Sequence, residues 1–211
     1  MASKTGQNST MDFTLLSKYN IPCLPFAFAK NAQDACMHAK KIGFPVALKL
    51  ISSKVLHKSE HHALSLNLKD EYSVKKEYAR LQKLTPPHDP ILVQKFSPST
   101  IELIAGGKMD SQFGPTIMVG LGGIYTEILK DVSIRICPAQ ERDIRSMIAQ
   151  LKSFPVLKGA RGQSGISLSQ LAKILHSLSL LMEKEQPAEI DINPLLLTSD
   201  GLVAADVRVL W

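Results

Sequence analysis

The sequence predicts an α+β fold built on antiparallel sheets, and two observations carry this prediction. Strand-like segments follow one another closely at 91–96, 101–107 and 115–121, which favours antiparallel pairing across short connections. Helical patterns lie apart from them at 139–152 and 167–184. With 211 residues, 45% of them hydrophobic, the chain can bury a core in one domain or in two small lobes.

The N-terminal part is expected to hold two helices around an extended segment. A short helix is predicted at 11–19, opened by Thr10. Two prolines make the segment 21–28 an edge strand or a connector, because proline cannot donate to a sheet ladder. The next helix is predicted to begin at Asn31 and to end at Gly43, since glycine readily adopts the left-handed conformation that stops a helix.

Two strands and a helix are expected next. The segment 46–51 is apolar apart from Lys49 and is typical of a strand. Apolar and polar residues alternate at 63–68, which predicts a half-buried strand that pairs antiparallel with the first. Asp70 is then expected to cap a helix that runs to about Leu84.

The second half combines strands, two helices and a closing hairpin. The strands from 91 to 121 are predicted to form one antiparallel section, with a turn around Asp110. The segments 189–197 and 203–210 resemble a β-hairpin with its turn at 199–201. The helix at 167–184 carries a stripe of leucines that we expect to be buried, namely Leu168, Leu171, Leu175, Leu178 and Leu181.

Composition excludes several classes of protein. No stretch approaches the roughly 20 apolar residues that span a bilayer, and the N-terminus lacks the apolar core of a secretory signal, so we predict a cytoplasmic protein without a membrane segment. The net charge of +6 comes without a run of five like charges and without basic residues interleaved with aromatics, so no nucleic-acid binding is predicted. The three cysteines lack the spacing of zinc ligands or of a disulfide scaffold.

Lys49 is the first candidate for chemistry. It lies near the end of an apolar strand, where a charged side chain needs a partner or a route to water. A phosphate group is one such partner. The alternative is an edge lysine whose stem lies along the sheet while its ammonium reaches solvent.

A polar cluster of an imidazole, an ammonium and a hydroxyl follows at His57, Lys58 and Ser59. A neutral imidazole can attack a phosphoryl group, and neighbouring donors can stabilise the charge that develops on its oxygens. A solvated loop would explain the same three residues.

The closing hairpin carries the candidate metal ligands. Glu189, Asp191 and Asn193 alternate with isoleucines, so in a strand their side chains share one face. Asp206 is expected on the paired strand. Oxygen ligands from two adjacent strands suit Mg²⁺, which takes one or two carboxylates and completes its shell with water and phosphates. The alternative is an acidic hairpin that faces solvent.

Two glycine-rich segments could approach phosphate. The run from Gly120 to Gly123 follows a predicted strand and could form an anion-binding nest, or simply a tight turn. The second segment, 158–162, contains Arg161, which could clamp a phosphate with two hydrogen bonds or pair with a surface carboxylate.

Seven motifs, taken in order, resemble the ATP-grasp domain of ADP-forming acetyl-CoA and acyl-CoA synthetases. They are KYNIP, GFPVALKL, HKS, ELIAGGKMDSQFGP, GLGGIYTEILKDVSIR, LKGARG and EIDINPLLL…AADVRV. The resemblance covers about residues 12–209. It implies an ATP-grasp fold whose two lobes clasp a nucleotide between antiparallel sheets, with the small lobe at 21–95 and the large lobe at 1–20 and 96–211.

The resemblance also implies roles for nucleotide-binding residues. Lys49 would contact the nucleotide phosphate, and Glu102 would lie beside the ribose. Gln94, Lys95 and Phe96 would line the adenine pocket at the hinge. The glycines expected at the nucleotide are Gly122 and Gly123.

The resemblance further implies that Mg²⁺ is the cofactor and that ATP or ADP is a substrate. Asn193 and Asp206 match the magnesium ligands, and Asp191 joins them on the same face. His57 matches the histidine that relays phosphate, and Lys58 and Arg161 complete the catalytic set.

The reaction implied is acyl-CoA + ADP + phosphate ⇌ carboxylic acid + CoA + ATP, through an acyl phosphate and a phosphohistidine. The implied partner is an α-type CoA-binding subunit, or an equivalent fused domain.

Two departures from the family pattern keep other functions open. His61 and His62 replace a usual glycine pair, which removes backbone freedom after the HKS motif. Lys95 replaces a usual acidic residue, where it could alter adenine recognition or point to solvent. The alternative function is a nucleotide-binding or regulatory module whose phosphoryl transfer is weakened or lost. A relative of succinyl-CoA or malate-CoA synthetases would differ mainly in its substrate.

Overall fold

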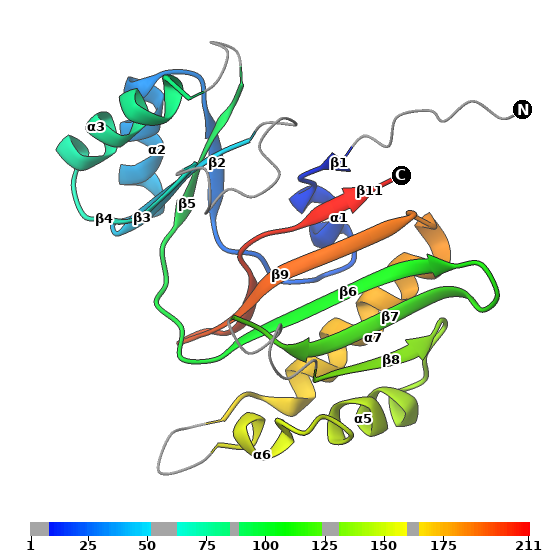
Figure 1. Ribbon diagram of the computed structural model, residues 1–211. Coiled ribbons are helices and arrows are strands. Elements are labelled where there is room, and N and C mark those ends of the chain that lie inside the picture. Colours follow the sequence, from blue (N-terminus) through cyan, green and yellow to red (C-terminus); the bar gives the residue numbers. More distant parts are fainter. Residues whose placement is uncertain (1–8, 52–62, 85–88, 124–130, 160–164) are drawn as a thin grey trace, which may run out of the picture. The chain divides into compact units, whose positions relative to one another are not determined.

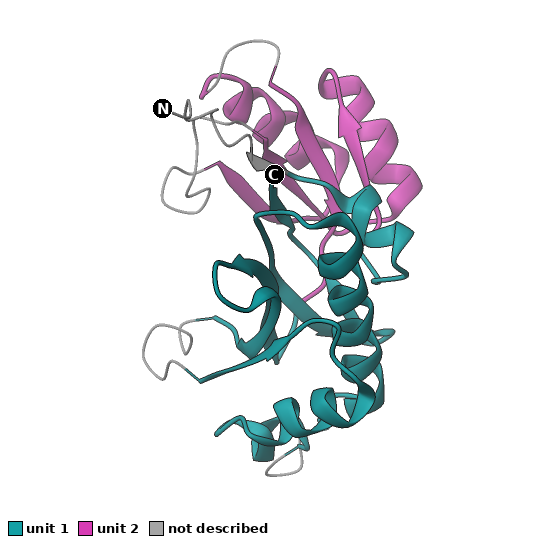
Figure 2. Ribbon diagram, turned by 90° about the vertical axis from the view of Figure 1, so that its right-hand side faces the viewer, with its two compact units in different colours: residues 1–23, 99–211 teal, residues 24–98 magenta. Residues whose placement is uncertain are grey.

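The computed structural model describes residues 9–51, 63–84, 89–123, 131–159 and 165–211. The chain divides into two compact units, of which unit 1 comprises residues 1–23 and 99–211 and unit 2 comprises residues 24–98 (Figure 2). Each unit is an antiparallel sheet with helices, so the predicted α+β class is confirmed. In these described ranges, no helix is long and apolar enough to cross a membrane.

Unit 2 contains a four-stranded sheet and two helices (Figure 1). The elements are β2 (Phe26–Ala29), α2 (Ala32–Ile42), β3 (Val46–Leu50), β4 (Leu64–Leu68), α3 (Glu71–Gln82) and β5 (Ile91–Lys95). The strand order is β2-β5-β3-β4, and every pair is antiparallel. The proline-flanked strand β2 is therefore an edge strand, as predicted, and β3 and β5 are interior.

The helix ends of unit 2 follow the predicted signals. The Asn31 side chain accepts a hydrogen bond from the Asp34 N–H at 2.8 Å, and Gly43 ends α2 with a φ of +87°. Asp70 begins α3 by accepting from the Ser73 N–H at 2.7 Å. The core of the unit lies between α2, α3 and one face of the sheet, which supplies alternate residues of β3 and β5.

Unit 1 contains a seven-stranded sheet. Its elements are β1 (Ser9–Thr10), α1 (Phe13–Lys18), β6 (Glu102–Asp110), β7 (Gly114–Leu121), β8 (Val132–Ile136), α5 (Glu141–Ala149), α6 (Phe154–Leu157), α7 (Leu168–Glu185), β9 (Glu189–Thr198), β10 (Gly201–Ala204) and β11 (Arg208–Leu210). The strand order is β1-β11-β9-β6-β7-β8, and β10 pairs with the far end of β9. Helix α7 packs on β6 and β7 (Figure 1). Four leucines of its predicted stripe are fully buried, whereas Leu168 is only partly buried.

Two expectations about the elements were wrong, and one strand was missed. The first helix is capped by Asp12, which accepts from the Leu15 N–H at 3.0 Å, while Thr10 belongs to β1. The section from 91 to 121 is not one sheet, because β5 lies in unit 2 and pairs with β2 and β3, whereas β6 and β7 pair in unit 1. Strand β8 was not predicted at all.

The closing hairpin is confirmed, but its second strand is interrupted. Strands β9 and β10 pair through Thr198 and Gly201, and β11 pairs with the first half of β9. Asp206 lies between Ala204 and Arg208, so it is in the break and not on a strand, contrary to the prediction. The break lies opposite Pro194, which has no N–H to donate to a sheet ladder.

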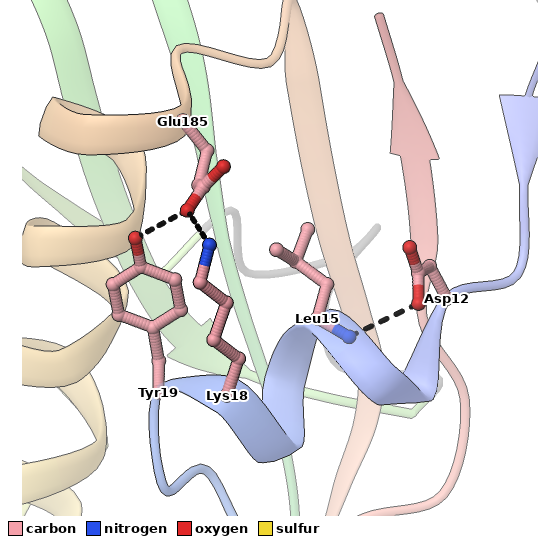
Figure 3. Close-up of polar contacts among 5 residues, drawn as sticks. All are labelled: Asp12, Leu15, Lys18, Tyr19 and Glu185. Carbon is pink, nitrogen blue, oxygen red and sulfur yellow. Dashed lines mark hydrogen bonds and ion pairs between the residues drawn. The ribbon is translucent and has the colours of Figure 1, made fainter.

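The KYNIP motif anchors α1 to the C-terminal end of α7. The Lys18 ammonium and the Tyr19 hydroxyl each donate to Oε1 of Glu185 at 2.6 Å (Figure 3). Burial, the hydrogen bond to Glu185 and its negative charge together raise the pKa of Tyr19 to about 12. The motif therefore has a structural explanation that does not involve a ligand.

Asn20 of the same motif ends α1 in a left-handed conformation with a φ of +55°. The Ile21 N–H donates to the Leu16 carbonyl and the Asn20 N–H to the Ser17 carbonyl, both at 3.0 Å. This is the Schellman pattern of a helix C-terminus.

Asn20→Ala is expected to lower the free energy of unfolding by about 1 kcal/mol, because a Cβ without a polar group disfavours the left-handed region. Asn20→Gly is the matched control and should unfold at the same or a higher temperature than the wild type. Thermal unfolding followed by circular dichroism measures both. An alanine variant as stable as the glycine variant would contradict this assignment.

Candidate functional site

Lys49 lies on the face of the unit 2 sheet that points away from α2 and α3. Side chains alternate along β3, so Val46 and Leu48 enter the helix-covered core while Lys49 points to the opposite face. The side chain is only 7% exposed, and β3 is an interior strand between β5 and β4. The alternative of an edge lysine with its ammonium in water is therefore wrong.

Gln94 of β5 lies on the same face. It pairs with Ala47, two residues before Lys49, and is only 1% exposed. Within the described part of the chain, its Nε2 atom has no hydrogen-bond partner. Leaving a buried donor unsatisfied costs roughly 1–3 kcal/mol. A hydrogen-bond acceptor on a bound molecule would remove that cost, so this face is suited to a polar ligand.

Gln94→Met is expected to raise the unfolding temperature of the ligand-free chain, because the apolar side chain leaves no buried donor unpaired. Gln170→Met is the matched control. The Gln170 amide is fully used by the backbone of Leu202, which donates to its Oε1 at 2.8 Å and accepts from its Nε2 at 3.3 Å. This control should lower the unfolding temperature. Destabilisation by both variants would show that the Gln94 amide has a partner inside the chain.

Lys95 and Phe96 continue β5 but their polar groups are engaged within unit 2. The Lys95 ammonium donates to the carbonyls of Gly43 and Phe44 at 2.9 and 3.0 Å, where it complements the negative C-terminal end of α2. The Lys95 side chain thus neither points to solvent nor shares a face with Gln94. The Phe96 N–H donates to the Pro45 carbonyl at 3.1 Å.

The acidic residues of β9 share one face of the unit 1 sheet, as their spacing predicted. Glu189 and Asp191 are partly exposed and Asn193 is exposed, whereas Ile190 and Ile192 between them are buried. Helix α7 packs on the sheet through β6, β7 and β10.

The charged form of Asp191 is disfavoured by its surroundings. Burial, followed by the charges of Glu189 and Asp206, raises its pKa to about 6, and Arg208 opposes this only in part. Arg208 lies directly across from Asp191 on β11. A carboxyl group whose proton is held this tightly marks a position where a cation would be stabilised.

The arrangement suits Mg²⁺ better than a metal that needs a full protein cage. In the parts of the chain that the structure describes, no three His, Cys, Asp or Glu side chains form a metal-binding group. Mg²⁺ requires only one or two carboxylates, with water and phosphate oxygens as its other ligands. Asp191, Asn193 and Asp206 offer such oxygens.

Glu102 and the glycines after β7 lie together in unit 1. The Gly122 N–H donates to the Glu102 carbonyl at 2.7 Å. A Cβ at Gly122 would come within 3.0 Å of the same carbonyl, and Gly123 has a φ of +66°. The Gly122 N–H is thus used within the chain, so the tight-turn interpretation accounts for this residue. His57, Lys58 and Arg161 lie outside the described residues.

The chain matches known proteins along almost its whole length. The model of the ATP-grasp domain family matches residues 3–210. The beta subunit of the ADP-forming acetate–CoA ligase I of Pyrococcus furiosus is 34% identical over 203 residues, which cover 93% of this chain and 88% of that subunit. The ADP-forming acetate–CoA ligase I of Archaeoglobus fulgidus is 35% identical over 92% of this chain but only 29% of its own length.

Solved structures agree with these sequence matches. A dinucleotide-forming acetyl-coenzyme A synthetase 1 from Ca. Korarchaeum cryptofilum, in complex with coenzyme A, Ca-AMPCP and HgCl+, has a TM-score of 0.90 at 35% identity and covers 98% of this chain and 95% of that one. A Pyrococcus horikoshii protein has a TM-score of 0.88 at 34% identity, with 98% and 93% covered. An ATP citrate lyase from Methanothrix soehngenii, 15% identical with a TM-score of 0.63, shares the fold alone.

Proposed function

Because the chain belongs to the ATP-grasp domain family, and within it to the beta subunits of ADP-forming acetate–CoA ligases, we propose that it binds a nucleotide and relays phosphate through His57. The reaction is acyl-CoA + ADP + phosphate ⇌ carboxylic acid + CoA + ATP. The single observation that carries the nucleotide part is the cluster of acidic side chains around Asp191, whose pKa is raised to about 6 by burial and by the charges of Glu189 and Asp206. The Mg²⁺ ion that accompanies a bound nucleotide would offset the negative charge of these carboxylates.

The metal and nucleotide contacts are assigned residue by residue. Asp191, Asn193 and Asp206 would hold Mg²⁺, which would neutralise charge on the phosphate oxygens. The ammonium of the buried Lys49 contacts a phosphate. The Gln94 Nε2, which has no hydrogen-bond partner among the described residues, donates to the base. Glu102, in unit 1, accepts from the ribose hydroxyls.

The phosphoryl relay has two steps, each a displacement at phosphorus. In the first, a ring nitrogen of His57 attacks an acyl phosphate, a P–N bond forms, and the carboxylate leaves with the electrons of the P–O bond. In the second, a terminal oxygen of ADP attacks the same phosphorus, the P–N bond breaks, and ATP and the free imidazole result. Lys58 and Arg161 stabilise the charge on the phosphoryl oxygens.

The acyl phosphate must be made elsewhere, on a CoA-binding partner. The Pyrococcus relatives carry the matching region in a separate beta subunit, and the Archaeoglobus relative carries it in less than a third of a longer chain. We therefore propose that this chain works with an α-type CoA-binding subunit or an equivalent domain, and that this partner selects the carboxylic acid.

Nucleotide binding to the isolated chain tests the first half of this proposal. ADP and ATP are titrated with and without Mg²⁺ into the wild type and Asp206→Ala. We expect binding that depends on Mg²⁺ and that weakens at least about ten-fold in the variant, because a ligand carboxylate is lost. Asp200→Ala, at the exposed turn of the same hairpin, is the control and should bind like the wild type. Equal affinity for all three proteins would refute the assigned metal site.

A further inference from the structure

Arg208 places a positive charge beside the proposed metal ligands. It is the first residue of β11 and lies directly across from Asp191 of β9. Residues that face each other in an antiparallel pair carry their side chains on the same face of the sheet, with Cβ atoms about 4.5–5.5 Å apart. Asp206 precedes Arg208 by two positions along the chain. The exposed Arg208 is thus a neighbour of two of the three proposed ligands.

The charge of Arg208 reaches Asp191. Burial, Glu189 and Asp206 raise the pKa of Asp191, and Arg208 acts in the opposite direction. An arginine stays charged across the physiological pH range, so this opposing charge is permanent. Glu189 also has a basic residue across from it, the exposed Lys108 of β6. Positive charges are therefore part of this acidic face.

The opposite side of Asp191 is bare. Its neighbour on β6 is Gly106, which contributes no side chain to this face. A Cβ at Gly106 would come within 2.6 Å of the Ile190 carbonyl oxygen, so a larger residue does not fit there without a shift of the backbone. A metal ion can therefore bind Asp191 on the side away from Arg208 and still feel its charge.

A fixed cation beside carboxylates acts in opposite ways on a free metal ion and on a metal–nucleotide complex. It repels Mg²⁺ alone, so the affinity of the carboxylates for the bare ion falls. ADP and ATP keep a net negative charge when they carry Mg²⁺, so the carboxylates repel the complex as a whole and the cation attracts it. A cation at this position therefore favours the complex over the bare ion.

We infer that Arg208 is a specificity-determining residue that makes the site select the magnesium–nucleotide complex over free Mg²⁺. This inference rests on the proposed function, in which Asp191 and Asp206 hold the metal. Its consequence is an order of binding, in which the carboxylates take up the metal together with the nucleotide and not before it.

The test measures two affinities of the isolated chain, in the wild type and in Arg208→Gln. The first is for Mn²⁺ alone, which prefers the same oxygen ligands as Mg²⁺ and whose free concentration is read by electron paramagnetic resonance. The second is for ATP in the presence of excess Mg²⁺. We expect the variant to bind Mn²⁺ roughly 3- to 10-fold more tightly and the magnesium–ATP complex more weakly by a similar factor, because one positive charge is lost.

Two further variants are controls for this substitution. Arg208→Lys keeps the charge and should match the wild type within about two-fold in both titrations. Arg145→Gln makes the same chemical change on α5, where Arg145 pairs with the Glu141 carboxylate at 2.6 Å, and should leave both affinities unchanged. If Arg208→Gln does not fold, Arg208→Met removes the same charge and takes its place.

The inference requires the two affinities to move in opposite directions. It is wrong if Arg208→Gln leaves either affinity unchanged or shifts both in the same direction. Asp206→Ala keeps the two proposals apart. If this variant binds Mn²⁺ and nucleotide like the wild type, the metal site of the proposed function is wrong and the inference falls with it. If Asp206→Ala loses binding and Arg208→Gln behaves like the wild type, only the inference fails.

Discussion

His57→Asn is expected to abolish ATP formation from acyl-CoA, ADP and phosphate when the chain is reconstituted with a CoA-binding partner. An asparagine amide does not form the P–N bond on which both displacement steps depend. Removing the group that carries a covalent intermediate should cost at least about a thousand-fold in kcat. Nucleotide affinity should stay within about two-fold, because His57 is not assigned to nucleotide binding. Turnover and nucleotide titration measure the two quantities separately.

The neighbouring histidines provide matched controls for this variant. His61→Asn and His62→Asn make the same chemical change within five residues of His57. Both should keep most of the turnover. Loss of turnover in one of them, with activity retained in His57→Asn, would transfer the relay to that residue. If all three variants stay fully active, the histidine relay is wrong and the alternative of a binding module without phosphoryl transfer is favoured.

Asp191→Asn is expected to have opposite effects on stability and on function. The pKa of Asp191 is about 6 in the folded chain, above the value of about 3.9 in unfolded protein. The folded state therefore binds this proton more tightly than the unfolded state does. The resulting contribution to the free energy of unfolding is fully present below about pH 4 and is lost as the pH rises through about 6. At about pH 8 in the absence of metal, the wild type must keep a charged carboxylate at this partly buried position, which destabilises the folded state. The neutral asparagine avoids this cost.

The size of the stability effect follows from the pKa shift. Two units correspond to about 3 kcal/mol, which partial exposure reduces to about 1–3 kcal/mol. The variant should therefore melt several degrees above the metal-free wild type at about pH 8 and should match it at about pH 4. Its Mg²⁺-dependent nucleotide affinity should fall at least about ten-fold.

Thermal unfolding across this pH range, with chelator present, measures the first effect. Asp200→Asn is the control for the substitution and should follow the wild type at every pH. An Asp191→Asn chain that is less stable than the wild type at high pH would mean that a cation of the protein already neutralises Asp191. Binding of nucleotide by the wild type should weaken as the pH falls through about 6, because protons compete with the metal.

Local signals in the sequence predicted much of the fold. Helix α2 follows Asn31 and ends at Gly43, as the capping preferences of these residues predict. The alternation along 189–193 correctly predicted that the polar side chains of this segment share one face of the sheet. These features depend on neighbours within a few residues. The choice of Thr10 over Asp12 as a helix cap failed because two good capping residues lie two positions apart.

Features that depend on distant pairing could not be predicted. Whether Lys49 lies on an edge or an interior strand is decided by β5, more than 40 residues later. The break at Asp206 depends on Pro194 in the partner strand. Strand β8 was missed because its pattern is inverted, with Val132, Ile134 and Ile136 exposed and Ser133 buried toward the helix side.

Asp131, a buried carboxylate directly before β8, was missed for a related reason. Its partners, the backbone groups of Lys152 and Ser153, are more than 20 residues away, and backbone acceptors and donors leave no mark in a sequence. The only local signal was a charged residue directly before an alternating segment. Buried carboxylates of this kind are recognised only once the fold has brought the backbone to them.

His57 is the proposed phosphate carrier, and mapping the phosphoryl group tests this role directly. The chain, with its CoA-binding partner, is incubated with Mg²⁺ and ATP labelled in the γ-phosphate, digested under alkaline conditions that preserve phosphohistidine, and analysed by mass spectrometry. We expect label on His57 that is absent from His57→Asn and that is removed by adding ADP. Label on His61 or His62, or label that ADP does not remove, would contradict it, as would a chain that binds the nucleotide and never becomes labelled.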